Sequence, residues 1–470
     1  GPASIAFTNG DAIGAVLDRN GLRPSRYIVT KDNLVVMASE VGVLPIDEAN
    51  IAFKGRLEPG KMLLVDLKEG RIITDDEIKS QITKKNPYSK WVSEHQINIK
   101  DLPVSQKPFE IDRASLLSRQ IAFGYTTEDI KFIISSMIKG EEATGSMGND
   151  TPLAVLSQKP QLLFHYFKQL FAQVTNPAVD SIREELVMSM DITLGEEKNL
   201  LSESPLHCRK LKLSHPILSI EEIEKIKALD QPDMKSVVLS TTFSRAGNGG
   251  LKKAMDLLCS QVSKAIENGA TIVVLSDRQM DSENCAIPSL LAVAGVHNYL
   301  LRNKTRTRVG LVIETGEPRE MMHFALLIGY GAGGVCPYLA YETALATAEE
   351  KIYVKDVSSQ LAIPNYIKST RKGLFKIIAK MGISTIQSYR GAQIFEAVGL
   401  NDEVVSQFFT DTPSRVSGAG LDVIEKEVLM RHQLAYENDD DLPAVLDAGG
   451  NYHWRRGGEE HMVNPNSIAL

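Results

Sequence analysis

The chain has 470 residues, of which 43% are hydrophobic and 24% are charged. These fractions are typical of globular proteins and exclude a disordered or collagen-like chain, and the length suffices for about two to four domains. The 52 Lys and Arg residues against 59 Asp and Glu give a net charge of −7. Because this charge repels a phosphate backbone, we expect no nucleic-acid partner.

The cysteines indicate a reducing compartment. Cys208, Cys259, Cys285 and Cys336 form no C-x-x-C pair and have no histidines at metal-ligand spacing. We therefore expect neither disulfides nor a bound metal, and we expect a cytoplasmic protein. The uncharged stretch 324–341 contains clustered glycines and a proline, so it predicts a helix end, a strand and a turn rather than a membrane span.

Residues 1 to about 75 predict an antiparallel sheet, because short apolar runs alternate with turn residues. Asn9-Gly10 and Asn20-Gly21 provide tight turns, and 31–33 does so less strongly. A sheet that starts in mid-pattern predicts further chain before Gly1. The expected strands cover residues 4–7, 13–17, 27–29, 34–37 and 62–65.

The middle of the chain is expected to be mainly helical. Residues 76 to 110 read as a helix followed by a linker, and the pattern from 112 to about 230 is helical, with Asp112 and Thr127 as N-caps. The turn-forming residues from Thr144 to Pro152 predict a structured loop within it.

From about 235 to 350, apolar strands alternate with helical stretches, which predicts parallel strands with right-handed crossovers. Polar residues and glycines follow these strands, and the carboxyl ends of parallel strands commonly carry sites or domain contacts. Residues 356–400 are expected to be helical, with a short strand at 382–386. The expected strands cover 237–239, 272–275 and 309–313, and the expected helices cover 249–268, 287–302 and 318–328.

No motif completes a catalytic constellation. Gly329-x-Gly331-x-x-Gly334 formally matches a dinucleotide fingerprint, but its preceding apolar residues are better read as a helix end than as the required strand. His207 and Cys208 are neighbours that would point in different directions. His165, His323 and His432 are interpreted as core or surface histidines, and Asp439–Asp441 as a solvated loop.

Several long motifs nevertheless resemble one family, the large subunit of glutamate synthase. The segment from Gly1 to Pro24, followed by Ala38-Ser39-Glu40, is similar to the later part of its glutamine amidotransferase domain. The remaining motifs resemble its central region and the approach to its flavin domain, so the resemblance covers essentially the whole chain. They are Ser146–Pro152, Gln173–Pro177, Glu314–Ala332, Lys380–Gln393 and Thr412–Arg415.

The resemblance implies a fold and a domain order. The expected class is α/β: an antiparallel remnant of an N-terminal-nucleophile amidotransferase domain, then a helical linker and a parallel β/α central domain related to a partial barrel. Residues 1–110 would end the amidotransferase domain, 111–350 would form the central domain, and 351–470 would finish it and lead into the FMN-binding domain.

The resemblance also implies a reaction. The family hydrolyses L-glutamine, passes the ammonia through an internal tunnel and reduces 2-iminoglutarate to L-glutamate, with electrons carried by FMN and an iron–sulfur cluster. Its partners would be the other domains of the same subunit and either a small NADPH-oxidising subunit or ferredoxin. Plants would place such a protein in the plastid stroma. No cofactor is expected within these 470 residues.

The site residues implied by the resemblance concern the tunnel. The glutaminase nucleophile of the family is an N-terminal cysteine, whereas residue 1 is Gly and the first cysteine is Cys208, so we expect no catalytic residue here. We expect one loop to line or gate the ammonia passage, because it combines small, flexible and hydrogen-bonding side chains. Its residues are Ser146, Met147, Gly148, Asn149, Asp150 and Thr151.

Two alternatives stay open, and one residue departs from the family pattern. The chain could be a binding or regulatory module without chemistry, or a nucleotide-dependent oxidoreductase using the Gly329–Gly334 loop. Cys336 stands where the family would have an asparagine, which weakens any specific role for that position.

Overall fold

The computed structural model describes residues 3–18, 21–103, 111–143, 150–170, 182–246, 249–437 and 445–470. The chain divides into two compact units, Gly1–Glu94 and His95–Leu470. None of the helices in the described ranges combines the length and the apolar character that crossing a membrane requires.

The first unit consists of two antiparallel sheets and the beginning of a helical segment. One sheet has the order β1-β2-β6-β7 and the other β4-β3-β5. The strands are β1 (Ser4–Thr8), β2 (Ala12–Leu17), β3 (Arg26–Thr30), β4 (Val35–Ala38), β5 (Ile51–Arg56), β6 (Met62–Asp66) and β7 (Arg71–Ile73). The helices α1 (Asp75–Lys84) and α2 (Tyr88–His95) follow. The predicted antiparallel sheet is therefore confirmed.

Tight turns between the strands and a small hydrophobic core stabilise the first unit. Gly10 has a φ of 91° between β1 and β2, and Asn33 has a φ of 66° between β3 and β4, so the predicted tight turns are confirmed at both places. Among the described residues, the core cluster of this unit contains four buried side chains, those of Ala15, Leu17, Leu57 and Leu63. All five residues of β1 are exposed, including Ile5 and Phe7.

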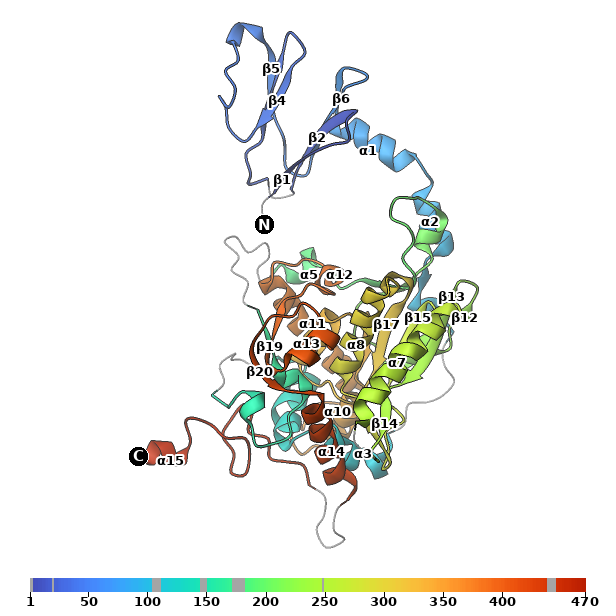
Figure 1. Ribbon diagram of the computed structural model, residues 1–470, viewed down its shortest axis with the longest axis vertical. Coiled ribbons are helices and arrows are strands. Elements are labelled where there is room, and N and C mark those ends of the chain that lie inside the picture. Colours follow the sequence, from blue (N-terminus) through green and yellow to red (C-terminus); the bar gives the residue numbers. More distant parts are fainter. Residues whose placement is uncertain are drawn as a thin grey trace. The chain divides into compact units, whose positions relative to one another are not determined.

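A five-stranded sheet of order β12-β13-β15-β17-β18 organises the second unit (Figure 1). Strands β13, β15, β17 and β18 are parallel to one another, whereas β12 pairs antiparallel with β13. The predicted β/α alternation is therefore confirmed, and the sheet does not close into a barrel. The strands are β12 (Asp230–Gln231), β13 (Met234–Ser240), β15 (Ile272–Ser276), β17 (Gly310–Glu314) and β18 (Gly334–Cys336).

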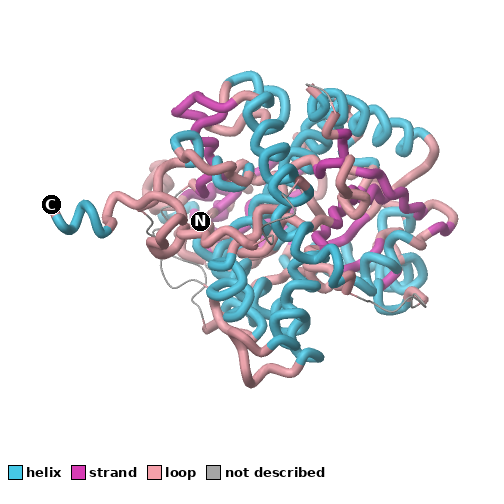
Figure 2. The backbone as a smooth tube through the Cα atoms, turned by 90° about the horizontal axis from the view of Figure 1, so that it is seen from below, coloured by secondary structure: helices cyan, strands magenta, loops and turns pink. Residues whose placement is uncertain are grey.

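Amphipathic and apolar helices connect these strands and bury them. β15 and β17 are buried along their whole length. Figure 2 distinguishes the strands from the helices around them. The helices are α6 (Ile220–Lys227), α7 (Gly250–Glu267), α8 (Ser289–Arg302), α9 (Met321–Gly329), α10 (Tyr338–Glu350) and α11 (Ser359–Lys380).

Smaller elements complete the second unit. A three-stranded sheet has the order β20-β19-β9, another has the order β10-β11-β8, and β14 pairs with β16. The strands are β8 (Ile97–Asn98), β9 (Phe167–Gln169), β10 (Ile192–Leu194), β11 (Leu211–Leu213), β14 (Thr242–Ser244), β16 (Asn284–Ala286), β19 (Phe395–Leu400) and β20 (Ser414–Ala419). The helices are α3 (Arg113–Ala122), α4 (Ser135–Ile138), α5 (Glu184–Val187), α12 (Ile386–Tyr389), α13 (Asp402–Phe408), α14 (Leu421–Tyr436) and α15 (Pro465–Ala469).

The structure corrects two expected elements. The helical pattern expected over 112–230, interrupted by the loop 144–152, holds only in part: helices α3, α4, α5 and α6 form, but the described chain between α4 and α6 consists mainly of short 3₁₀ turns and strands of three residues, since prolines such as Pro152, Pro160 and Pro205 interrupt helical hydrogen bonding. The strand expected at 382–386 is wrong. Gly382, with a φ of 69°, follows the end of α11, and the strand forms later as β19.

Side-chain hydrogen bonds fix where α3 and the following helical stretch begin. Asp112 is the N-cap of α3, as predicted, and accepts hydrogen bonds from the backbone N–H groups of Ala114 and Ser115. The next helical stretch is a π-helix, Asp129–Ile134, and its start is fixed by reciprocal bonds between Thr126 and Asp129 rather than by Thr127.

Candidate functional site

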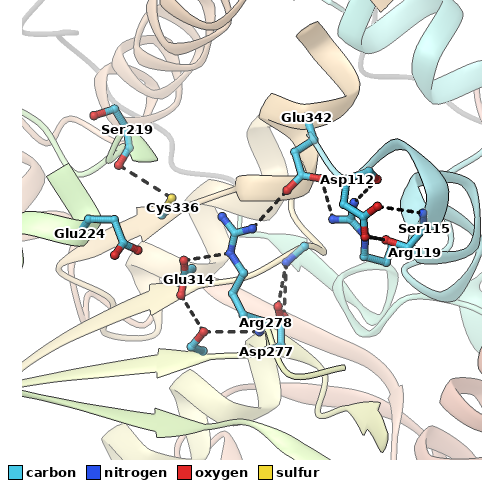
Figure 3. A network of polar contacts seen from close by, with 12 residues as sticks. Asp112, Ser115, Arg119, Ser219, Glu224, Asp277, Arg278, Glu314, Cys336 and Glu342 are labelled. Carbon is cyan, nitrogen blue, oxygen red and sulfur yellow. Dashed lines mark hydrogen bonds and ion pairs between the residues drawn. The ribbon is translucent and has the colours of Figure 1, made fainter. Parts of the chain in front are cut away.

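Polar side chains gather at the carboxyl edge of the parallel sheet (Figure 3). Strand β15 ends at Ser276 and is followed by Asp277 and Arg278, while β17 ends at Glu314. β15 and β17 are paired in parallel with Ser276 opposite Glu314, so their carboxyl ends meet at one place. This is the edge at which open α/β sheets hold their ligands.

Glu314 is the buried centre of this group. Its side chain is fully buried and accepts hydrogen bonds from Ser276 Oγ at 2.6 Å, Arg278 Nε at 3.0 Å and Lys227 Nζ at 2.8 Å. Burial alone would raise the pKa of Glu314, but the charges of Arg278 and Lys227 outweigh it and lower the pKa. The carboxylate is therefore ionised at neutral pH.

Arg278 extends the network away from the strands. Its guanidinium lies 3.9 Å from the centre of the Tyr338 ring and donates to Glu342 Oε1 at 3.2 Å. Glu342 is in turn paired with Arg119 at 2.6 Å. Charges of alternating sign thus run from Lys227 on α6 through β17 and β15 to α10 and α3, and they fasten helices to both strands.

Asp277 is the group of this edge that titrates near neutral pH. It is buried, and its carboxylate accepts from Thr315 Oγ1 at 2.5 Å and from the Gly316 N–H at 3.1 Å. Burial raises the pKa of Asp277 to about 7, although the hydrogen bonds from Thr315 and Gly316 oppose the shift. Asp277 can therefore hold or release a proton at physiological pH, and its hydrogen bonds also shape the turn after β17.

The next residues along β17's loop brace neighbouring elements. Glu317 accepts from Ser289 N at 2.8 Å and from Ser289 Oγ at 2.5 Å, at the start of α8. Arg319 pairs with Asp129 at 3.0 Å and donates to the carbonyl of Phe123 at 3.0 Å. A small cavity beside them, lined partly by Glu317, Arg431 and His432, has room for about one water molecule.

These contacts show that the polar edge of the sheet binds mainly the protein's own groups, with Asp277 as its titratable acid. Each carboxylate of the edge accepts hydrogen bonds from the protein's own cations, hydroxyls or backbone N–H groups. Buried charges that are fully paired hold their neighbours in fixed positions and exchange partners slowly with solvent. The arrangement favours a structural task over direct attack on a substrate.

Comparison with known sequences decides the family. The sequence model described as the glutamate synthase central domain matches residues 118–401, which is more than half of the chain. The chain belongs to the glutamate synthase family. A second model, described as class-II glutamine amidotransferases, matches residues 1–91. The resemblance seen in the sequence motifs is therefore confirmed.

The full length of this chain matches part of several curated relatives in the glutamate synthase family. The glutamate synthase (NADPH) large chain of Bacillus subtilis is 48% identical over 469 residues, covering 100% of this chain and 30% of the relative. The ferredoxin-dependent glutamate synthase 2, chloroplastic, of Arabidopsis thaliana is 44% identical over 484 residues, covering 100% and 29%. The glutamate synthase (NADH) of Schizosaccharomyces pombe is 41% identical over 484 residues, covering 100% and 23%. The chain thus spans less than a third of each relative.

The expected tunnel loop of this glutamate synthase chain falls mostly outside the described residues. Ser146, Met147, Gly148 and Asn149 are among those not described, and so is Gln173–Pro177. Asp150 and Thr151 are described. Asp150 accepts from the Val463 N–H at 3.0 Å and from His461 Nδ1 at 2.6 Å, so its carboxylate holds the C-terminal segment.

The glycine motif Gly329-x-Gly331-x-x-Gly334 connects a helix to a strand, which is the reverse of a dinucleotide fingerprint. It follows α9 and enters β18. Gly331 has a φ of 118°, and a Cβ there would lie 2.3 Å from His297 Nδ1. The glycine is needed for close packing, as the interpretation of these residues as tight backbone turns predicts.

The cysteines are free and mainly structural. Cys208, Cys259, Cys285 and Cys336 are all unpaired, and Cys336 is fully buried with its Sγ 3.9 Å from the Ser219 carbonyl. Burial raises the pKa of Cys336 well above its usual value, so the thiol stays protonated. Cys336 therefore packs against α6's first turn rather than reacting.

Sequence reasoning identified the strand-end residues but missed their partners. Lys227, Glu342 and Arg119 lie on helices far along the chain, and each looks like an ordinary amphipathic-helix charge in its own window. The only sequence signal was their position on helical faces that also carry apolar residues, which does not select a partner.

Proposed function

We propose that this chain is the connecting part of a glutamate synthase large chain. The whole protein would hydrolyse L-glutamine to L-glutamate and ammonia, condense the ammonia with 2-oxoglutarate, and reduce the resulting 2-iminoglutarate with two electrons and two protons. Similarity to large chains over 100% of these residues, centred on the central-domain match, carries the proposal.

Within that protein, residues 1–110 would complete the amidotransferase domain, 111–350 would form the central domain, and 351–470 would lead into the FMN-binding domain. The region matched to class-II amidotransferases contains no cysteine, so the glutaminase nucleophile would lie elsewhere in the protein. The partners would be the remaining domains and either a small NADPH-oxidising subunit or ferredoxin.

The N-termini of α7 and α8, at the edge of the parallel sheet, are occupied by the protein's own carboxylates. A flavin phosphate commonly binds at a helix N-terminus, where free backbone N–H groups point to it. At α7 these groups donate to Glu425, from Gly249 at 3.0 Å and Gly250 at 3.2 Å, and at α8 the Ser289 N–H donates to Glu317. FMN and the iron–sulfur cluster would therefore be held by other parts of the parent protein.

The test of the reaction uses the complete protein that contains this chain. Glutamate formation is measured from 2-oxoglutarate with glutamine or ammonia, and with NADPH, NADH or reduced ferredoxin as donor. We expect synthesis from both nitrogen sources and a clear preference for one donor. A complete protein that forms no glutamate with any donor would contradict the proposal and favour the binding-module alternative.

The tunnel role of Ser146–Thr151 is part of the same proposal. Met147→Trp would obstruct a passage lined by this loop, so glutamine-dependent synthesis should fall while ammonia-dependent synthesis persists. Met188→Trp serves as a control for a bulky change at a buried methionine of the same unit. Equal loss from both nitrogen sources, or no loss from either, would show that the loop does not line the passage.

A further inference from the structure

Three potential metal ligands meet away from the charged edge described above. His165 lies on a 3₁₀ turn, Leu163–Tyr166, Glu320 immediately precedes α9, and His323 lies in the first turn of α9. One donor atom from each lies within 4.8 Å of the others. The fold therefore brings two imidazoles and a carboxylate together from distant parts of the sequence.

The contacts of His165 fix its ring, and among the described residues only its Nδ1 takes part in a hydrogen bond. Its Nδ1 lies 2.8 Å from Gln161 Oε1. The amide of Gln161 cannot be reversed without loss, because its Nε2 donates to Ser157 Oγ at 2.9 Å and to Glu459 at 3.0 Å. Gln161 thus accepts the Nδ1 proton, which leaves the lone pair of His165 on Nε2.

His323 supplies a buried nitrogen that no hydrogen bond satisfies. Its ring is 1% exposed and stacks on Phe164 with centroids 4.2 Å apart. Its Nε2 lies 3.1 Å from Glu320 Oε1 but has no hydrogen bond of acceptable geometry among the described residues. A buried imidazole nitrogen without such a bond, aimed at a carboxylate, points to an additional ligand.

Glu320 completes the donor set. The hydroxyl of Tyr452 donates to its Oε2, which leaves Oε1 directed to His323. The neighbouring Arg319 guanidinium is directed to Asp129 and to backbone carbonyls, so its charge is neutralised on the other side. The three donors are therefore two imidazole nitrogens and one carboxylate oxygen.

We propose that His165, Glu320 and His323 bind a divalent transition-metal ion, through Nε2 of each imidazole and Oε1 of the carboxylate. Two imidazoles and one carboxylate suit Zn²⁺ and its first-row neighbours, whereas Mg²⁺ and Ca²⁺ prefer oxygen donors. Gln161 and Tyr452 act as outer-shell partners that orient two of the ligands. Water fills the remaining coordination position.

Binding requires one rearrangement of a proton. In the metal-free structure Nδ1 of His323 accepts a long bond of 3.3 Å from the Arg319 N–H, so Nε2 carries the proton. When the ion binds Nε2, that proton moves to Nδ1 and the long bond is given up. The ion would then clip the turn at His165 to the start of α9.

The test is titration of the purified, chelator-treated protein with Zn²⁺ by calorimetry and with Co²⁺ by visible absorption. We expect one ion per chain and a Co²⁺ spectrum without the thiolate charge-transfer band that cysteine ligation gives. X-ray absorption of the zinc-loaded protein should show nitrogen and oxygen neighbours with imidazole scattering. No stoichiometric binding, or sulfur in the first shell, would overturn the proposal.

Variants assign the binding to these residues. Gln161→Leu, which removes an outer-shell partner, should weaken Zn²⁺ binding by roughly 10- to 100-fold, and His165→Asn and Glu320→Gln by more. His207→Asn is the matched control, since His207 lies on another short 3₁₀ turn, Pro205–Cys208, outside the cluster. Circular dichroism identifies any variant that fails to fold, and His165, which is less buried than His323, is the histidine whose replacement should disturb the fold less. Unchanged affinity in folded His165→Asn would refute the site.

Discussion

Replacing Glu314 with glutamine removes the one negative charge that Lys227 and Arg278 share in the interior. Glu314 is fully buried, whereas the side chains of Lys227 and Arg278 are 20% and 34% exposed. Removal of one partner from a buried ion pair costs about 3–5 kcal/mol, and screening at the two partly exposed cations reduces this to about 2–4 kcal/mol. We expect Glu314→Gln to lower the free energy of unfolding of the second unit by that amount.

Urea denaturation followed by circular dichroism measures the loss, and hydrogen exchange at β15 and β17 assigns it to the sheet. Glu403→Gln is the matched control, because Glu403 and Lys252 are both exposed and 3.9 Å apart, so its effect should stay below about 0.5 kcal/mol. Lys227 keeps its ion pair with Glu224 at 2.7 Å in the Glu314→Gln variant, so the loss should stay nearer the lower end of the range of about 2–4 kcal/mol.

The pH dependence provides a second check on Glu314. Its pKa in the folded protein is below the usual 4.5, so its contribution is present above pH 4.5 and is lost as the pH falls through the lowered pKa. The difference between wild type and Glu314→Gln should therefore shrink in acid. A glutamine variant as stable as the Glu403→Gln control at neutral pH would refute the claim that this carboxylate neutralises buried charge.

Three further predictions concern Asp277, the contact between Asp150 and His461, and Gly331. Because burial raises the pKa of Asp277 from 3.8 to about 7, wild-type stability should decline as the pH rises between these values, and Asp277→Asn should remove that decline in unfolding curves against pH. His461→Gln should increase tryptic cleavage after Arg456. The ratio of variant to wild-type cleavage rates, which cancels the pH dependence of trypsin itself, should be largest between about pH 4 and 6.5. The hydrogen bonds from Val463 and His461 lower the pKa of Asp150, and although burial opposes it, the bonds to Gly450 and Asp150 raise the pKa of His461. Gly331→Ala should cost about 2–4 kcal/mol in urea denaturation. Gly269 also has a positive φ, of 86°, but a Cβ there would face open space, so Gly269→Ala should cost about 1 kcal/mol.

The parts of the fold that follow from local sequence were predictable. β2, β3 and β15 are apolar runs bounded by turn residues. The helices α7 and α8, which precede and follow β15, have apolar residues at helical spacing. β19 was not predictable, because Gly399 within Phe395–Leu400 weakens the strand pattern and the strand depends on pairing with β9 and β20. Its partners are set by tertiary structure rather than by its own residues.

The same limit applies to the two polar clusters. The strand-end residues Asp277 and Glu314 were foreseeable because a parallel sheet gathers them at one edge. His165 and His323 were interpreted separately as core or surface histidines. Glu320 is only three residues before His323, but nothing in either sequence window indicates that His165 lies beside them. This proximity depends on how α9 packs on the 3₁₀ turn Leu163–Tyr166, and that packing cannot be predicted from a single sequence.

Glu128 anchors the C-terminal stretch 450–453 to the second unit, which is what the proposed connecting role requires. Its buried carboxylate accepts backbone N–H bonds from Gly450 at 2.9 Å, Asn451 at 2.6 Å, Tyr452 at 3.2 Å and His453 at 3.0 Å. Successive N–H groups around one anion form a nest whose geometry is fixed by the backbone. Side-chain replacement within the stretch therefore leaves this anchor intact, whereas loss of the single Glu128 carboxylate releases four bonds at once. Such an anchor supports the proposed role, because a passage between two active centres requires that the chain joining them keep its place.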